Sequence, residues 1–425
     1  MSINTKSSHI ILQLLTGAAL SLAMVAGAQT AATPPADKAA APAAAAATPA
    51  ADPAAAAAAP TPLSTFVLTG PLTWLPPATF DAGPLGKLSV NGILTGFSQF
   101  QSNHVAGDEG AQATLSNGQI FIQKADGKVQ FFVQAGVYTM QALSVPFASA
   151  QTTNTNFYGP VPVAYLKLPV GKTTQFLIGS LPTLMGAEST FTYQNFNVER
   201  GIIWNQENAI NRGVQVNQTI NKYLSASFSW NDGYYSNRYS WLSGSVTFTK
   251  GPHTLVYDGM GNLGQTVFET AATPIQNNGY MHAVIYTYAK GPWIVSPYFQ
   301  YGNLPTNPTV GVLKGTSATG GAINVSYAFK SGFSLPARVE YLTSSGNAID
   351  GSVNMLGFGA GSSGTTFTAT PTYQKGGMYV RGDLAWVHAS NYTPGSVFGT
   401  TGTADNQFRG VLEFGFIFGK NFVEK

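Results

Sequence analysis

The feature that most constrains the fold is a series of short Gly- and Lys-rich turns, each between two runs of alternating apolar and polar residues. Such a turn predicts a tight β-hairpin. Longer loops rich in Gly, Ser, Thr and Asn separate the turns. The turns are Ala125-Asp126-Gly127, Gly171-Lys172, Asn221-Lys222, Lys250-Gly251-Pro252, Lys290-Gly291-Pro292, Ser331-Gly332 and Lys375-Gly376-Gly377. Seven short turns alternating with eight longer loops predict sixteen antiparallel strands, an even count typical of a membrane β-barrel.

The predicted strands are mostly long enough to cross a bilayer, which takes about 9–11 residues. They are 88–101, 118–124, 128–139, 161–170, 173–181, 211–220, 223–231, 241–249, 253–262, 278–288, 292–302, 318–330, 333–344, 364–374, 377–388 and 406–418. The segment 118–124 is the weakest of them. We assign 352–360 to a loop, because a strand there would break the alternation of turns and loops.

Alternation within the strands predicts an apolar face toward lipid and a polar face toward the lumen. In 223–231, Leu224, Phe228 and Trp230 lie on one face and the serines lie on the other; 241–249, 364–374 and 406–418 behave alike. A soluble β-sandwich would also alternate, but its strands would be fewer and its polar face less rich in Ser, Thr and Gln. The pattern therefore favours an all-β, transmembrane, up-and-down antiparallel barrel.

Composition supports a membrane protein without transmembrane helices. Charged residues make up 9% of the chain, against about 25% in soluble proteins. No apolar run of about 18 residues follows the N-terminus. The chain has no Cys, which excludes disulfides and thiol chemistry. Its net charge of +3 is too small to indicate a nucleic-acid partner.

Four segments organise the chain. Residues 1–28 resemble a secretory signal peptide, with Lys6 before an apolar stretch and small residues at the cleavage site; a retained anchor is the alternative. Residues 29–62 are rich in Ala and Pro and predict a disordered periplasmic linker. Residues 63–87 predict a short pre-barrel segment, either an extra strand or a piece tucked at the periplasmic mouth. Residues 88–425 form the predicted barrel.

Three late strands carry charged residues at positions of lumen-facing parity. We predict that these line the pore: Arg338, Glu340, Arg381, Asp383, Arg409 and Glu413. Their mixed signs suggest a transverse field that orients hydrated solutes. Internal salt bridges that stiffen the wall are the alternative, and the two are compatible.

The longest outer loop, about 182–210, contains Glu188, Glu199, Arg200 and Glu207 together with several aromatic residues. It is the third outer loop, and the third loop of many porins folds inward. We therefore predict that it narrows the lumen; an exposed loop packed on its own aromatics is the alternative.

Charge also separates by side. Eight lysines sit at the short turns, whereas the long loops hold nine acidic residues against three basic ones, a formal charge of −6. The hypothesis that follows is an outer vestibule that mildly concentrates cations.

Signals for catalysis are weak. No two of His104, His253, His282 and His388 have the spacing of metal ligands. No P-loop and no GxGxxG opening a helix occurs. We predict no catalytic, metal or cofactor site, although the many serines leave a barrel hydrolase formally open.

These features resemble the OmpL-like family of β-barrel porins. The resemblance rests on Leu177-Ile178-Gly179, on Leu184-Met185-Gly186-Ala187-Glu188, on Asn195 to Arg200 and on Asn211-Arg212-Gly213-Val214, and it covers about 88–418. It implies a pore for small hydrophilic solutes without naming one. One departure concerns the barrel assembly machinery, which reads a terminal aromatic in many barrels: here Phe422 is followed by three more residues.

The sequence thus predicts an outer-membrane porin for passive diffusion of small hydrophilic solutes or ions, in contact with outer-membrane lipid and without an enzymatic role. Monomer and homotrimer both stay open. The alternative is a non-conducting barrel whose extracellular loops act in binding or adhesion.

Overall fold

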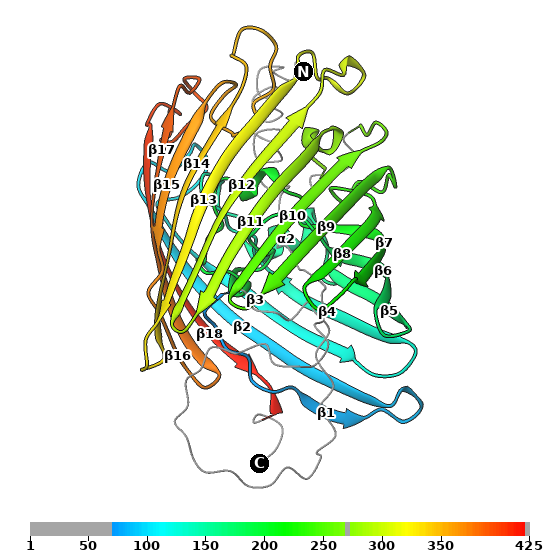
Figure 1. Ribbon diagram of the computed structural model, residues 1–425. Helices are drawn as coiled ribbons and strands as arrows, with labels where there is room; N and C mark the ends of the chain where they lie inside the picture. The colour runs from blue at the N-terminus through cyan, green and yellow to red at the C-terminus, as the bar shows by residue number, and fades with distance from the viewer. Residues whose placement is uncertain (1–69, 268–272, 421–425) are drawn as a thin grey trace, which may run out of the picture.

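The computed structural model describes residues 70–267 and 273–420, whose strands form one closed antiparallel sheet (Figure 1). The strands are β1 (Ala78–Asp81), β2 (Lys87–Gln101), β3 (Ala111–Lys124), β4 (Gln130–Tyr138), β5 (Val163–Val170), β6 (Thr174–Pro182), β7 (Ile210–Thr219), β8 (Leu224–Asn231), β9 (Trp241–Lys250), β10 (His253–Asn262), β11 (Tyr280–Lys290), β12 (Trp293–Leu304), β13 (Thr316–Ala328), β14 (Phe333–Ser344), β15 (Ser363–Ala369), β16 (Thr372–Lys375), β17 (Met378–Ser390) and β18 (Asn406–Phe418). The predicted signal peptide and linker lie outside the described residues.

Sixteen strands make up the barrel wall, as the sequence predicts. β15 and β16 both pair with β14 and with β17, so they are two halves of one wall strand. The interruption falls at Thr370 and Pro371, because proline has no N–H to donate to a ladder. The short β1 pairs only with β2. The barrel closes where β18 pairs with β2, from Arg409↔Gln101 to Phe418↔Gly92.

The two ends of the barrel differ as the turn pattern predicts. Gly127, Gly171, Gly251, Gly291, Gly332 and Gly376 all have positive φ at the short turns, a conformation that glycine adopts without steric cost. These turns lie at the lower end of the barrel in Figure 1, near β1 and the end of β18, and the longer loops lie at the upper end. We expect the lower end to face the periplasm.

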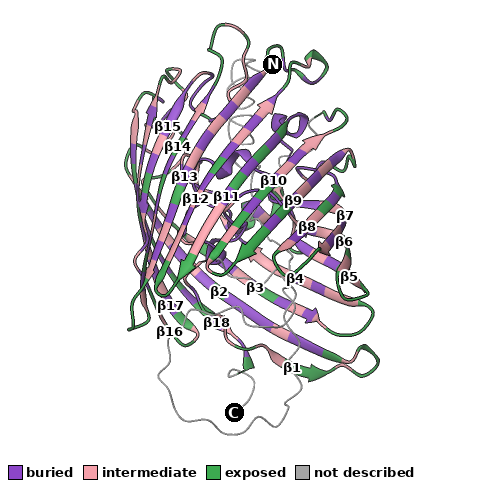
Figure 2. Cartoon of the chain, viewed as in Figure 1, coloured by how far each residue is buried: buried purple, intermediate pink, exposed green. Residues whose placement is uncertain are grey.

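Burial alternates along the strands (Figure 2). On β18, Phe408, Leu412 and Phe414 are exposed, whereas Arg409 and Glu413 are buried. The apolar residues face outward around the wall, which suits contact with lipid hydrocarbon. Within 70–267 and 273–420, no helix has the length and apolar character that a membrane-spanning helix needs.

One predicted strand was too short. The structure extends 118–124 back to Ala111, and the added residues pair with β2 as far as Phe100. The sequence 111–117 gave little signal because small and polar residues dominate it, and the register shifts between Thr95 and Gly96. Residues 352–360 lie in a loop, as predicted.

Residues 70–76, here called the strap, run from the barrel rim into the lumen. The Pro76 carbonyl accepts a hydrogen bond from the Lys420 N–H at 2.7 Å. The Thr73 N–H and carbonyl both bond the Gln374 side chain at 2.7 Å. Trp74 packs edge-on against Phe121 at 5.4 Å. The Gly70 N–H then donates to the Gln194 carbonyl at 3.0 Å, so the strap reaches the third long loop from the end of the barrel that carries the short turns.

A candidate pore constriction

The third outer loop, residues 183–209 and here called L3, lies inside the barrel. All of its residues except Ala187 and Phe196 are buried. Two short 3-10 helices, η3 (Thr192–Gln194) and η4 (Trp204–Gln206), turn its backbone within the lumen. The loop therefore does not stand exposed above the membrane.

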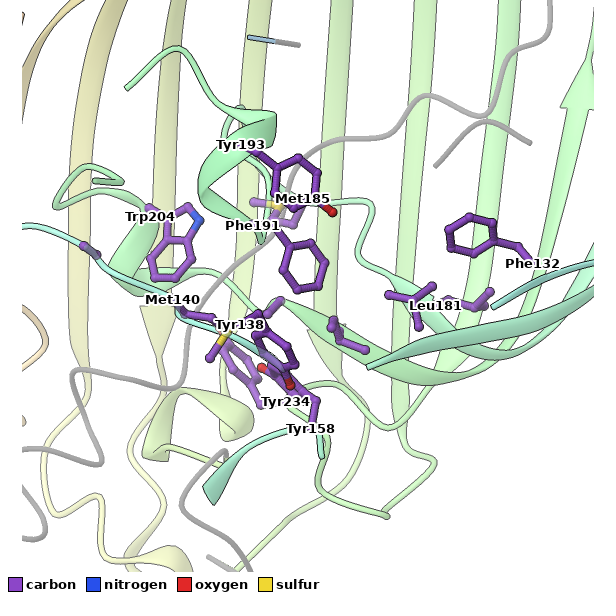
Figure 3. Close-up of a cluster of buried hydrophobic side chains, with 14 of the residues drawn as sticks. Phe132, Tyr138, Met140, Tyr158, Leu181, Met185, Phe191, Tyr193, Trp204 and Tyr234 are labelled. Atoms are coloured by element: carbon purple, nitrogen blue, oxygen red, sulfur yellow. The ribbon is translucent and has the colours of Figure 1, made fainter. Parts of the chain in front are cut away.

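One flank of L3 packs on aromatic side chains of the wall. Figure 3 shows Phe191 of L3 between Tyr193 of the same loop and Tyr138 at the end of β4. The rings of Phe191 and Tyr138 meet edge to face at 5.2 Å, and Tyr193 contacts Phe121 of β3 at 6.1 Å. Such pairs add about 0.5–1.5 kcal/mol each beyond the area they bury. Aromatic packing therefore holds this flank of L3 against the wall.

The opposite flank of L3 binds charged side chains of β14. Arg338 donates to the Glu188 carboxylate at 2.5 Å and to the Glu199 carbonyl at 3.1 Å. Glu340 accepts hydrogen bonds from the Ile202 N–H at 3.2 Å and the Ile203 N–H at 3.4 Å. The two charged side chains of β14 therefore bind a carboxylate, a carbonyl and two backbone N–H groups of L3.

β17 and β18 hold the tip of L3 in the same way. Arg381 forms an ion pair with Glu413 at 2.6 Å and donates to the carbonyls of Thr192 and Asn195 at 3.0 and 3.1 Å. The Thr192 hydroxyl donates to Glu413 at 3.0 Å. Each of these two wall residues therefore contacts the other and the loop.

The remaining two predicted wall residues bind the middle of L3. Arg409 pairs with the Glu199 carboxylate at 3.0 Å. Asp383 accepts a hydrogen bond from the Glu199 N–H at 2.7 Å and another from the Thr370 hydroxyl. Both wall residues are buried.

All six predicted wall residues face the lumen, and every one contacts L3. Four of them also pair within the wall, as Arg338–Glu340 at 3.1 Å and Arg381–Glu413. We call the lumen faces of β14, β17 and β18 the charged wall. The charged groups of this wall bind other groups of the protein. This is the internal salt-bridge arrangement that the sequence analysis gave as the alternative, with L3 included.

The four charged residues predicted in the constriction loop behave differently from one another. Glu188 and Glu199 pair with wall arginines. Arg200 stacks over Trp204, with 4.4 Å between its guanidinium carbon and the ring centre, and its guanidinium nitrogens make no hydrogen bond. Glu188 and Glu199 lie near enough to act on it electrostatically. The carboxylate of Glu207 is fully buried and has no hydrogen-bond partner.

Glu207 sits against Gly186, and the charged groups that act on it most strongly are acidic. A Cβ added at Gly186, whose φ is +90°, would overlap the Glu207 carboxylate. Burial raises the pKa of Glu207 well above its usual value, and Glu188, Asp258 and Glu340 raise it further. L3 therefore places a buried carboxyl group without a hydrogen-bond partner inside the barrel, and its raised pKa favours the uncharged form.

Asp258 on β10 is a second unpaired carboxylate, which the sequence analysis missed. It is buried and makes no hydrogen bond. The Ser245 hydroxyl, directly across on β9, and the Gly186 N–H are its polar neighbours, although neither has hydrogen-bond geometry. The sequence could have revealed it, because Asp258 is the only acidic residue in 253–262 and has lumen-facing parity.

The wall around Asp258 carries hydroxyl and amide groups. We call the lumen faces of β7 to β10 the hydroxyl wall; its buried polar residues are Asn211, Gln215, Asn217, Ser225, Ser229, Asn231, Ser243, Ser245, Thr247 and Asp258. Some bond to one another, as the Asn231 amide does to Ser229 and Ser243 at 3.0 and 3.1 Å. Asn217 Nδ2 and Ser245 Oγ have no partner.

A second loop enters the lumen without having been predicted to. Residues 139–143 are buried, and Ala142 bridges Arg200 of L3 in parallel. The Leu143 N–H donates to the Arg200 carbonyl at 2.8 Å, and Arg409 donates to the Ala142 carbonyl at 3.0 Å. The segment 139–148 contains no charged residue, an unusual feature for an outer loop that could have revealed it.

The structure changes the charge expected outside. Glu188, Glu199 and Glu207 are inside the lumen, and Asp232 pairs with Arg212 at 2.7 Å. Asp350 pairs with Lys314. The formal −6 of the outer loops therefore overstates the exposed charge, because three of its carboxylates and Arg200 lie inside the barrel; the vestibule hypothesis stays a prediction.

Nothing in the described part of the chain suggests a metal centre. Within 70–267 and 273–420, no group of three or more His, Asp and Glu side chains is arranged to hold a metal ion.

Known proteins resemble this chain in family and in fold. The family model described as putative beta-barrel porin-2, OmpL-like, matches residues 87–418. No curated protein matches the chain. Solved structures with the same fold include the outer-membrane channel DcaP of Acinetobacter baumannii, with 11% identity, 80% of this chain and 100% of that chain covered, and a TM-score of 0.53. OmpT of Vibrio cholerae has 11% identity, coverage of 79% and 99%, and a TM-score of 0.52. An anion-selective porin from Comamonas acidovorans has 11% identity, coverage of 78% and 99%, and a TM-score of 0.51.

Proposed function

This chain belongs to the putative beta-barrel porin-2, OmpL-like family, and on that premise we propose that it lets small hydrophilic solutes or ions diffuse passively across the outer membrane. The observation that carries the proposal is a closed wall of sixteen strands, apolar outside and polar inside. A barrel of sixteen strands encloses enough space for an aqueous channel. L3 and the charged wall would then set the limits of size and charge.

The cellular setting is part of the proposal. A porin-family barrel resides in the bacterial outer membrane, and we propose that residues 1–28 direct its export and that 29–62 tether it on the periplasmic side. The lipid-facing wall would contact outer-membrane lipid, and the assembly machinery would read an aromatic near the end of β18. Association as a trimer is also proposed. The family and the fold are those of channels, so we propose no catalytic role.

The rival function is a non-conducting barrel that uses its outer loops for binding. One observation favours it: L3 contacts the wall on both flanks, through Tyr138 on one side and Arg338 on the other. A loop fixed at both flanks obstructs more of the lumen than a loop held at one.

Single-channel recording of the full-length protein, purified from outer membranes into a planar bilayer, separates the two functions. Stable current steps are the result expected of a diffusion pore. A folded, inserted protein that carries no current would overturn the proposal and turn attention to the outer loops. Folding is checked by the mobility shift on heating that intact barrels show in gels.

A further inference from the structure

We propose that Ser390, His388 and Asn406 form a nucleophilic site on the outer face of the barrel wall, and that this site hydrolyses acyl esters of membrane lipids. The site lies outside the lumen, so the activity is additional to the proposed pore and does not depend on it. Neither the family nor the barrel fold indicates catalysis; the indication is a set of hydrogen bonds between β17 and β18.

Three side chains of these neighbouring strands form a hydrogen-bonded series. On β17, the Ser390 hydroxyl lies 3.0 Å from Nε2 of His388. On β18, Oδ1 of Asn406 lies 3.1 Å from Nδ1 of the same ring. His388 and Asn406 are direct partners in the strand register, so the backbone brings them together. A nucleophile within hydrogen-bond reach of a base that a third group orients is the arrangement typical of nucleophilic catalysis.

The residue before Asn406 sets the direction of every bond in the series. Nδ2 of Asn406 lies 2.6 Å from Oδ1 of Asp405. Since a carboxylate can only accept, the amide nitrogen faces Asp405 and the amide oxygen faces His388. That oxygen needs an N–H from Nδ1, which leaves Nε2 with its lone pair. Nε2 therefore accepts from the Ser390 hydroxyl, and this is the tautomer that a general base requires.

The imidazole ring is also held by an aromatic neighbour. The rings of His388 and Trp386 stack with 5.8 Å between their centres and 7° between their planes. Ser390, His388 and Asn406 are all half-buried. The side chains therefore keep one mutual orientation and are still reached from outside the wall.

The position of the site indicates a lipid substrate. His388 and Ser390 share the parity of Leu384, and Asn406 shares that of Phe408; both apolar residues are exposed on the outer face. They lie further from the long loop between β17 and β18 than the site does. In a bilayer, acyl esters lie at the boundary between the hydrocarbon core and the headgroups. A site just beyond the apolar band of the wall meets esters at that level.

Water is the co-reactant that the hydrolysis uses. Ser390 Oγ attacks the acyl carbon, and its proton passes to Nε2 of His388, which gives it to the oxygen of the departing alcohol. A water molecule, deprotonated by the same nitrogen, then cleaves the acyl–Ser390 ester. One ester and one water thus give one carboxylic acid and one alcohol. Asn406 is a positioning residue, because it acts through His388.

The nucleophile is tested by covalent labelling of the full-length protein, purified from outer membranes in detergent. A fluorophosphonate probe should modify Ser390, which mass spectrometry of the peptide containing it would detect. Labelling at this position should be absent in Ser390→Ala and strongly slowed in His388→Ala. Ser98→Ala, which changes a serine of outward parity on β2, is the matched control and should be labelled like wild type.

Turnover is measured with a phospholipid in mixed micelles and with p-nitrophenyl butyrate, a soluble ester. Wild type should release fatty acid from the phospholipid. Ser390→Ala should fall to background, and His388→Ala should lose about 10²–10⁴-fold in rate. His282→Ala should keep the full rate; His282 also faces outward and bonds a hydroxyl, that of Tyr257 at 2.8 Å. Asn406→Ala should lower kcat and leave KM unchanged, whereas a distorted site would change both.

The outcomes distinguish this activity from the pore. Hydrolysis by a protein that carries no current supports the inference and contradicts the pore. A folded wild type that is not labelled at Ser390 and hydrolyses neither ester overturns the inference, whatever current it carries. Hydrolysis that persists in Ser390→Ala also overturns it, because another group would be responsible. Turnover of the soluble ester alone would support the nucleophile and overturn the assignment of lipid as its substrate.

Discussion

The two sides of the lumen are both polar, yet they use polarity differently. On the charged wall, Arg381 and Glu413 bind each other and the backbone of L3. On the hydroxyl wall, Asp258 and Ser245 face each other across neighbouring strands and neither has a hydrogen-bond partner. The comparison teaches that a lumen-facing charge is not by itself a pore-lining charge. Whether its partners come from the protein or from solution decides its role.

The difference also explains why charge is concentrated on one side. Buried ion pairs are costly to desolvate and hold only when further hydrogen bonds satisfy them. L3 supplies those bonds through its carbonyls and N–H groups. The charged wall thus holds the loop, whereas the opposite wall carries mainly hydroxyl and amide groups.

The largest difference between the walls should appear in stability. Arg381→Ala removes donors from the Thr192 and Asn195 carbonyls and leaves Glu413 buried without its cation, which should cost about 3–5 kcal/mol of unfolding free energy. Asp258→Asn should change it by less than about 1 kcal/mol, because no partner is lost. Urea unfolding in detergent, followed by Trp fluorescence, gives both values. Equal losses would erase the distinction between the walls.

Gly186 tests how closely L3 approaches the hydroxyl wall. Gly186→Ala should cost about 1–3 kcal/mol from its positive φ, and more because the new methyl group overlaps Glu207. Gly357→Ala is a matched control, since its φ of +87° is similar and no atom lies within 4 Å of an added Cβ. Thermal unfolding of the two variants isolates the contact. If Gly357→Ala proves as harmful, crowding at Glu207 is not the cause.

The strap gives a smaller, local effect. Trp74→Ala removes two edge-to-face contacts, with Phe121 and Tyr193, each worth about 0.5–1.5 kcal/mol beyond burial. Hydrogen exchange of the Gly70 amide, which donates to Gln194, should become faster while exchange in β7 to β10 stays slow. Trp293→Ala, at the lipid-facing rim, is the control that should leave the strap protected. Exchange that stays slow in Trp74→Ala would show that the strap is held mainly by its backbone contacts.

The smallest effect is expected at the outer loops. Hydrogen bonds from Lys314 and then from the Ser352 hydroxyl lower the pKa of Asp350. A lowered carboxyl pKa stabilises the fold above the unfolded value of about 3.9 and loses that effect as pH falls through the folded value. Asp350→Asn should therefore weaken the pH dependence of unfolding slightly between pH 5 and 2, and only at low salt, because the pair is exposed. A large effect would mean that this pair holds the outer loops together.

Much of the fold was accessible from the sequence because its determinants are local. Turn glycines and period-two alternation act within a few residues, so strand order, closure and the inward orientation of Arg338 or Arg409 follow from them. The partners of these arginines were not accessible. Glu188 lies 150 residues from Arg338, and Glu199 lies 210 residues from Arg409. No pattern within a few residues encodes such a pairing. In the sequence, Asp258 does not differ from other polar residues of the strands, and its position near Gly186 is seen only in the structure.

The strap has a mechanical consequence. Three hydrogen bonds, linked by short stretches of the chain, connect the two ends of the barrel: Lys420 to Pro76 at the rim, Gly70 to Gln194 at the tip of L3, and the Gln206 amide to the Met355 carbonyl of a long loop at 2.7 Å. Tension applied along the chain at Gly70 would pull first on the tip of L3 and only then on the wall. The barrel therefore contains a load path that runs through its interior, from the end with the short turns to the end with the long loops.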